Sequence, residues 1–110
     1  MAEIVAVYEL HTFSSLNKEF LAEYRGSLDG VDKAAVFFNP QVIEHKKLPP
    51  ISPQEVVEAF GNNAIEVITH TEDLKSWIQS CRSENRQVLL LMSSGNFGGI
   101  DSAEFISLFN

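Results

Sequence analysis

Cysteine, basic residues and long apolar runs are all scarce in this sequence. Its single cysteine, Cys81, cannot form an internal disulfide, which favours the cytoplasm over a secreted location. No apolar run reaches the roughly 18 residues that a membrane-spanning helix needs, and the residues after Met1 lack the basic start of a signal peptide. These absences predict a soluble cytoplasmic protein with no membrane partner.

Basic side chains are outnumbered by acidic ones. The chain has 8 Lys and Arg against 15 Asp and Glu, a formal net charge of -7. Because this charge repels phosphate backbones, nucleic acid is not expected as a partner. Apolar residues are plentiful at 45%, and 110 residues suit one domain, so residues 1–110 are predicted to share a single core.

Four apolar runs, at residues 4–8, 34–38, 65–68 and 88–92, are rich in β-branched and aromatic side chains. Each run is continuous rather than alternating, and each precedes a helical pattern, which indicates strands covered on both faces. We therefore predict a three-layer α/β/α, Rossmann-like domain with parallel strands near residues 3–9, 33–38, 64–69 and 86–92.

The intervening helices have readable ends and faces. Apolar spacing predicts an amphipathic helix over residues 16–28, with Phe20 on its buried stripe. Ser52, Pro53 and Glu55 form a capping-box pattern, and Gly61 suits the helix exit. Thr71 is expected to cap a further helix, which places Cys81 in the core. Asp101 is expected to cap the last helix. The connection at residues 39–51 is expected to lack regular structure, as a surface loop or a ligand-facing one.

Polar residues gather where the predicted strands end, which is where open parallel sheets bind ligands. The first strand ends in Glu9, His11 and Thr12, followed by Ser14 and Ser15, of which one is expected to cap the next helix. His11 is read either as a structural histidine or as a ligand contact, and His70 as structural or exposed. No acid/base pair of Glu9 and His11 is assumed.

A glycine-rich stretch follows the last strand. Ser93, Ser94 and Asn96 offer hydrogen-bonding groups beside Phe97, Gly98 and neighbouring glycines that permit close approach of a ligand. Two interpretations stay open: a site for a carboxylate or amide, or a tight turn capped by Asp101. The stretch has neither the Gly-Lys-Ser/Thr of a phosphate-binding loop nor the position of a dinucleotide fingerprint, so ATP binding by this chain is not expected.

These two strand exits resemble those of the C-terminal domain of the Mur ligases. Strand one with residues 9–15, and Met92 to Ile100 after the last strand, are similar to that domain, most of all in the peptidoglycan-recycling branch, UDP-N-acetylmuramate:L-alanyl-γ-D-glutamyl-meso-diaminopimelate ligase. That branch ends its last strand in Met-Ser-Asn-Gly-Gly-Phe-Gly-Gly-Ile. The likeness extends from Ile4 to Ile100, and the second motif is the more specific.

The resemblance implies both a strand order and a reaction. The order is last strand, first, second, third (4-1-2-3), in a domain that lacks its first two family strands. The implied activity is ATP-dependent amide formation on UDP-N-acetylmuramate in bacterial peptidoglycan metabolism. ATP and magnesium belong to other domains of the same ligase, this chain carries no catalytic residue or metal site of its own, and alone it is expected to be inactive.

The resemblance also assigns a binding role to the strand exits. Glu9, His11, Thr12, Ser14, Ser15, Ser93, Ser94, Asn96, Phe97 and Gly98 are implied to hold an amino-acid or peptide acceptor. His11 matches a family histidine, whereas Thr12 and Ser15 stand where the muramate-alanine ligases have arginines. The identity of the acceptor therefore stays open.

Two further expectations follow. A non-enzymatic ligand-sensing or interaction domain is the rival class, because the same layout would serve it. If the last strand lies at an open edge, residues 88–92 offer it no charge and no proline, so self-association through that edge is expected.

Overall fold

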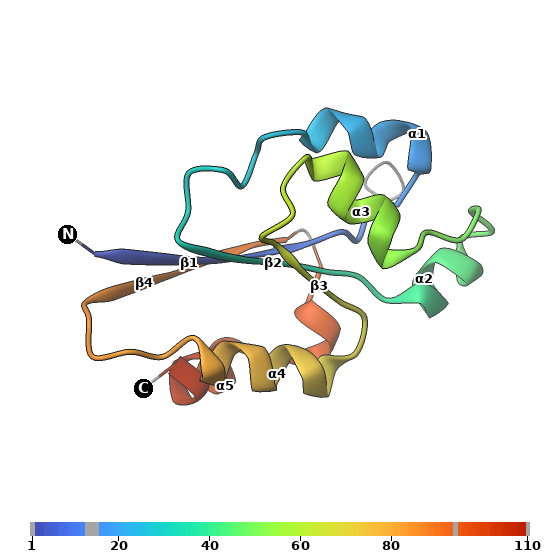
Figure 1. Cartoon of the computed structure of the whole chain (residues 1–110). Coiled ribbons are helices and arrows are strands. Elements are labelled where there is room, and N and C mark those ends of the chain that lie inside the picture. The colour runs from blue at the N-terminus through green and yellow to red at the C-terminus, as the bar shows by residue number, and fades with distance from the viewer. Residues whose placement is uncertain (1, 13–15, 94, 110) are drawn as a thin grey trace.

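A computed structural model describes residues 2–12, 16–93 and 95–109 (Figure 1). Its four strands are β1 (Glu3–Glu9), β2 (Lys33–Phe37), β3 (Glu66–Ile68) and β4 (Gln87–Met92). All neighbouring strands pair in parallel, in the order β3-β2-β1-β4. The predicted fold class and strand order are both confirmed.

Helices cover both faces of this sheet (Figure 1). On one face lie α1 (Lys18–Leu21), the 3-10 turn η1 (Ala22–Tyr24) and α3 (Pro53–Phe60), and on the other lie α4 (Thr71–Ser80) and α5 (Ser102–Phe109). The short α2 (Pro40–His45) follows β2, and the 3-10 turn η2 (Phe97–Gly99) follows β4. Two buried clusters, one on each face, form the core.

Local signals set several helix ends as predicted. Ser52 and Glu55 form the reciprocal capping box, with the Glu55 N–H donating to Ser52 Oγ at 3.2 Å and the Ser52 N–H to Glu55 Oε1 at 3.0 Å. Gly61 ends α3 with φ 66°, a left-handed conformation that glycine adopts without a steric penalty. The Glu104 N–H donates to Asp101 Oδ1 at 2.9 Å, which caps α5.

The helix predicted over residues 16–28 is wrong in its length. The cap of α1 is Asn17, which accepts the Glu19 N–H, where Ser14 or Ser15 was expected. Gly26, at φ 80°, lies in a turn beyond η1. Leu16, Leu21 and Leu28 are buried as expected, but Phe20 is 41% exposed because the chain leaves the helical path after one turn. Tyr24 instead anchors this segment by stacking on Phe60, with ring centroids 5.3 Å apart.

Three other local predictions need correction. Residues 39–51 contain α2, capped by Asn39 through the Gln41 N–H, where an irregular connection was expected. Thr71 is not a cap but the first residue of α4, and its hydroxyl donates to the Gly98 carbonyl at 3.2 Å. β4 is not covered on both faces, since Val88 is 49% and Leu90 42% exposed at the edge of the sheet.

No helix within the described ranges is both long and apolar enough to cross a bilayer. Cys81 is 3% exposed at the end of α4, as predicted for a core residue. Burial removes water from around the thiol and so disfavours the charged thiolate, which raises the pKa of Cys81.

The raised pKa of Cys81 predicts a specific loss of stability in alkali. The folded chain keeps the thiol proton at pH values where the unfolded chain releases it, so the unfolding free energy falls as pH rises above about 8.5, the ordinary pKa of a thiol. Urea unfolding of the wild type and Cys81→Ala across this range measures the effect. A fall with pH as steep in Cys81→Ala as in the wild type would contradict it.

Candidate functional site

The carboxyl ends of β1 and β4 lie side by side, since Tyr8 pairs with Met92 in the parallel ladder. The chain segments that follow these strands therefore start from neighbouring positions, 84 residues apart in sequence. The exit of β2 is used locally by Asn39, which caps α2, and β3 lies at the far edge of the sheet. The sequence-predicted pairing of the β1 and β4 exits is thus present in the fold.

Glu9 joins the two exits. Its side chain, only 5% exposed, presents Oε1 to the Ser93 hydroxyl at 2.5 Å and to the Phe97 N–H at 2.9 Å. Ser93 Oγ in turn accepts the Gly95 N–H at 2.7 Å. Hydrogen bonds to a buried carboxylate are stronger than neutral ones and costly to break, so Glu9 holds Ser93 and Phe97 in place.

Phe97 holds the loop from the other side. Its φ of 52° is unusual for a residue with a side chain and costs of order 1 kcal/mol or more. The bond from its N–H to Glu9 offsets this cost, as does edge-to-face packing of its ring on Phe105 at 5.3 Å. Gly98 follows with φ 67° and lies so close to Thr71 and Phe37 that a side chain has no room.

Beside this loop lies an open groove of about 530 Å³, between the end of β4 and the start of α5. Leu91, Phe97 and Phe105 contribute apolar side chains to its lining. Asn96, Asp101 and Ser102 contribute polar ones, and Asp101 is the one charged residue lining the groove within the described chain. Carboxylate and amide groups beside an apolar surface suit a ligand with an amino group better than a phosphate.

The predicted site residues divide into two sets. Glu9, Ser93, Phe97 and Gly98 bond or pack within the protein and shape the loop. Asn96 is exposed in the groove, and half-buried His11 contacts Gly95, which also lines it. Thr12 is exposed, and its carbonyl accepts the Leu16 N–H. Ser14, Ser15 and Ser94 lie outside the described residues.

Phe97 was among the predicted site residues, but the rest of the apolar lining was missed from sequence. Leu91 and Phe105 were expected only as core residues, yet both border the groove. Along β4 the exposure of the side chains alternates, and the odd-numbered ones face α5. An alternation of apolar and polar residues would have revealed this in the sequence, but every residue from 88 to 92 is apolar.

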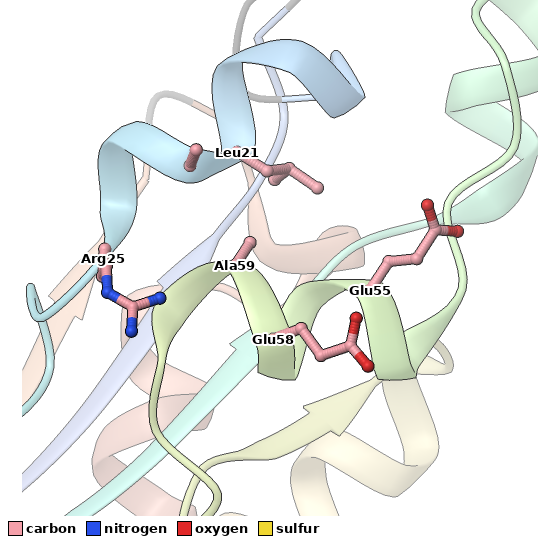
Figure 2. Close-up of a pocket in the computed structure, with 6 residues that line it drawn as sticks. Leu21, Arg25, Glu55, Glu58 and Ala59 are labelled. Carbon is pink, nitrogen blue, oxygen red and sulfur yellow. The ribbon is translucent and has the colours of Figure 1, made fainter.

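A second hollow, of about 310 Å³, lies between α1 and α3 (Figure 2). Leu21, Arg25, Glu55, Glu58 and Ala59 line it. Its two carboxylates already bond within α3, Glu55 in the capping box and Glu58 with Gln54 at 3.2 Å. It shares no residue with the strand exits, so it is not included in the candidate site. In the ranges that the structure describes, no three His, Cys, Asp or Glu side chains are grouped to hold a metal ion.

Comparison of the chain with known protein families, with curated proteins and with solved structures finds no significant match. The candidate site is therefore defined by its own geometry.

Gly95 gives the most direct test of that geometry. A Cβ at this position would stand 2.6 Å from Cγ of His11 and 2.9 Å from Glu9 Oε1, so Gly95→Ala must displace the loop. We expect it to lower the unfolding free energy by about 1–3 kcal/mol. Gly30→Ala is the matched control, because nothing lies within 4 Å of its added Cβ. Chemical denaturation measures both, and equal effects of the two substitutions would show that the packing of Gly95 is not as described.

Proposed function

We propose that this chain is the acceptor-binding domain of an ATP-dependent amide ligase of the Mur type. The observation that carries the proposal is the pair of hydrogen bonds that Glu9 accepts from the Ser93 hydroxyl and the Phe97 N–H. They hold the groove lined by Asn96 and Asp101 beside His11. The carboxyl ends of parallel strands are where this class of sheet binds small ligands, and the groove lies at the carboxyl end of one of them, β4. The likeness of both strand exits to the Mur ligases supplies the reaction.

In the proposed reaction, a carboxylate of UDP-N-acetylmuramate is activated as an acyl phosphate on another domain, with ATP and magnesium. The amine of an amino acid or peptide attacks the acyl carbon, phosphate leaves, and the nitrogen loses a proton. The task of this chain is to hold that amine close to the acyl phosphate and to exclude water, which would hydrolyse it. The other domains of the ligase and the acceptor are the implied partners, and the cytoplasm is the implied compartment.

The groove supports the assignment of an amine-bearing ligand. Asp101 supplies the one negative charge among its described lining residues, and the amide of Asn96 can bond a carboxylate or peptide group. Leu91 and Phe105 provide apolar contact for a side chain of the acceptor. Asp101 also opposes phosphate at the start of α5, in keeping with nucleotide chemistry elsewhere.

The test uses the full-length ligase. We expect Asn96→Ala and His11→Ala to lower kcat/KM for the acceptor by about 10- to 150-fold, the equivalent of one hydrogen bond to a charged group, with the KM for ATP unchanged. Asn62→Ala is the control, because Asn62 accepts the Ala64 N–H in the turn before β3 and does not line the groove. An unchanged acceptor dependence in both groove variants would contradict the proposal.

The ligase proposal and its rival, a ligand-sensing domain without catalysis, differ in what the gene should encode before this chain. The ligase proposal requires a Gly-x-x-Gly-Lys-Ser/Thr motif encoded about two hundred residues before Ile4, the length of one intervening domain. It also requires that this chain alone binds Mg-ATP weakly or not at all in a calorimetric titration. A coding sequence without that motif, or micromolar ATP binding by this chain, would favour the rival.

A further inference from the structure

β4 is the last strand of the sheet, with β1 on one side and no strand on the other among the described residues (Figure 1). The Glu3 N–H donates to the Arg86 carbonyl at 2.8 Å, so residues 86, 88 and 90 turn their backbone groups toward β1. The backbone groups of Gln87, Leu89 and Leu91 therefore point outward. They form a row of donors and acceptors along the edge of the sheet.

Natural sheet edges are usually blocked by a charge, a proline or a bulge, and β4 has none of these. Val88 and Leu90 are 49% and 42% exposed on the face that carries α1 and α3. On the opposite face, Leu89 and Leu91 border an open apolar groove of about 300 Å³ beneath α5, where Ile106 is 63% exposed. A strand added at this edge would thus find apolar contacts on both of its faces.

We propose that the occupant of this edge is β4 of a second copy, paired antiparallel across a two-fold axis at Leu90. Strand pairing across such an axis keeps the two faces of the sheet continuous only when even-numbered residues pair with even-numbered ones and odd with odd. With the axis at Leu90, Leu89 opposes Leu91, Val88 opposes Met92, and Gln87 opposes Ser93. Apolar side chains meet apolar ones and polar meet polar, so the edge is complementary to itself.

The charges flanking β4 favour the same arrangement. Residues 82–86, before the strand, carry Arg82 and Arg86 against one acid, Glu84, whereas residues 93–101, after it, carry only Asp101. Antiparallel pairing lays the net-positive end of one copy beside the net-negative end of the other, whereas parallel pairing would set like ends together. The register also makes Leu89 and Leu91 a hydrogen-bonded pair, because the backbone groups of both point outward.

This interface is small, built from one six-residue strand and part of α5, so it forms a weak dimer whose population rises with protein concentration. The edge shares Leu91, Ser102 and Phe105 with the groove at Asn96, but it uses neither Asn96 nor Asp101, and its tests measure association rather than ligand use. Sedimentation velocity over about a hundredfold range of concentration should show monomer passing to dimer, and no larger species, because the two-fold axis closes the assembly.

Cysteine cross-linking tests the register, in a Cys81→Ala background that removes the native thiol. In the proposed pair, Leu90 faces its own copy as a non-hydrogen-bonded pair with Cα atoms about 4.5 Å apart, so Leu90→Cys should form an intermolecular disulfide on mild oxidation. Val88→Cys is the matched control, with similar exposure, because its two copies stand about 13 Å apart, four residues along the strand. Equal cross-linking of the two variants, or none of Leu90→Cys, would overturn the register.

Introducing a charge at β4 tests whether the dimer forms through this edge and not through another surface. Leu90→Lys sets two like charges at the axis and should weaken the dimer at least tenfold, whereas Phe20→Lys, an exposed apolar residue on α1, should leave it unchanged. A wild type that stays monomeric at every concentration, or a dimer that Phe20→Lys disrupts and Leu90→Lys does not, would contradict the proposal.

Discussion

The Glu9 carboxylate is the interaction on which the candidate site depends. Hydrogen bonds within helices and between paired strands place β1 and β4 next to each other, but they do not set the path of the chain beyond the strands. Glu9 does so by accepting the Ser93 hydroxyl and the Phe97 N–H across 84 and 88 residues of sequence. A carboxylate only 5% exposed requires such partners, because a buried charge without hydrogen bonds is strongly destabilising.

The consequences reach from the loop to both helices on that face of the sheet. With Phe97 held at φ 52°, its ring packs on Phe105 of α5, and Gly98 can approach Thr71 of α4. The Ser93 hydroxyl also accepts the Gly95 N–H, and this bond holds Gly95 close to His11. The groove beside Asn96 and Asp101 therefore has an outline set by interactions within the protein, and such preorganisation would serve the acceptor-positioning role proposed above.

Much of the fold follows from local sequence. Continuous apolar runs predict the four parallel strands, and the Ser52 to Glu55 capping box and Gly61 predict the ends of α3. The strand order came from the family resemblance. The helix over residues 16–28 was overestimated because its apolar spacing is also satisfied by one turn of helix and a 3-10 turn, ended by Gly26.

The site was harder to predict than the fold. Sequence pattern placed Glu9 among the residues that bind a ligand, but its internal bonds depend on contacts with residues more than 80 positions away, which no local pattern encodes. The same limit applies to β4. Its apolar run is typical of an interior strand, and only the strand order shows that Val88 and Leu90 lie at an edge.

Hydrogen exchange at the Phe97 amide tests the role of Glu9 most directly. If Glu9 fixes the loop, this amide exchanges slowly in the wild type and far faster in Glu9→Ala, while amides of the β1 core such as Val7 keep their protection. That pattern would show a loop released from an intact sheet. Fast exchange of Phe97 in the wild type, or the same slow rate in both proteins, would contradict the account.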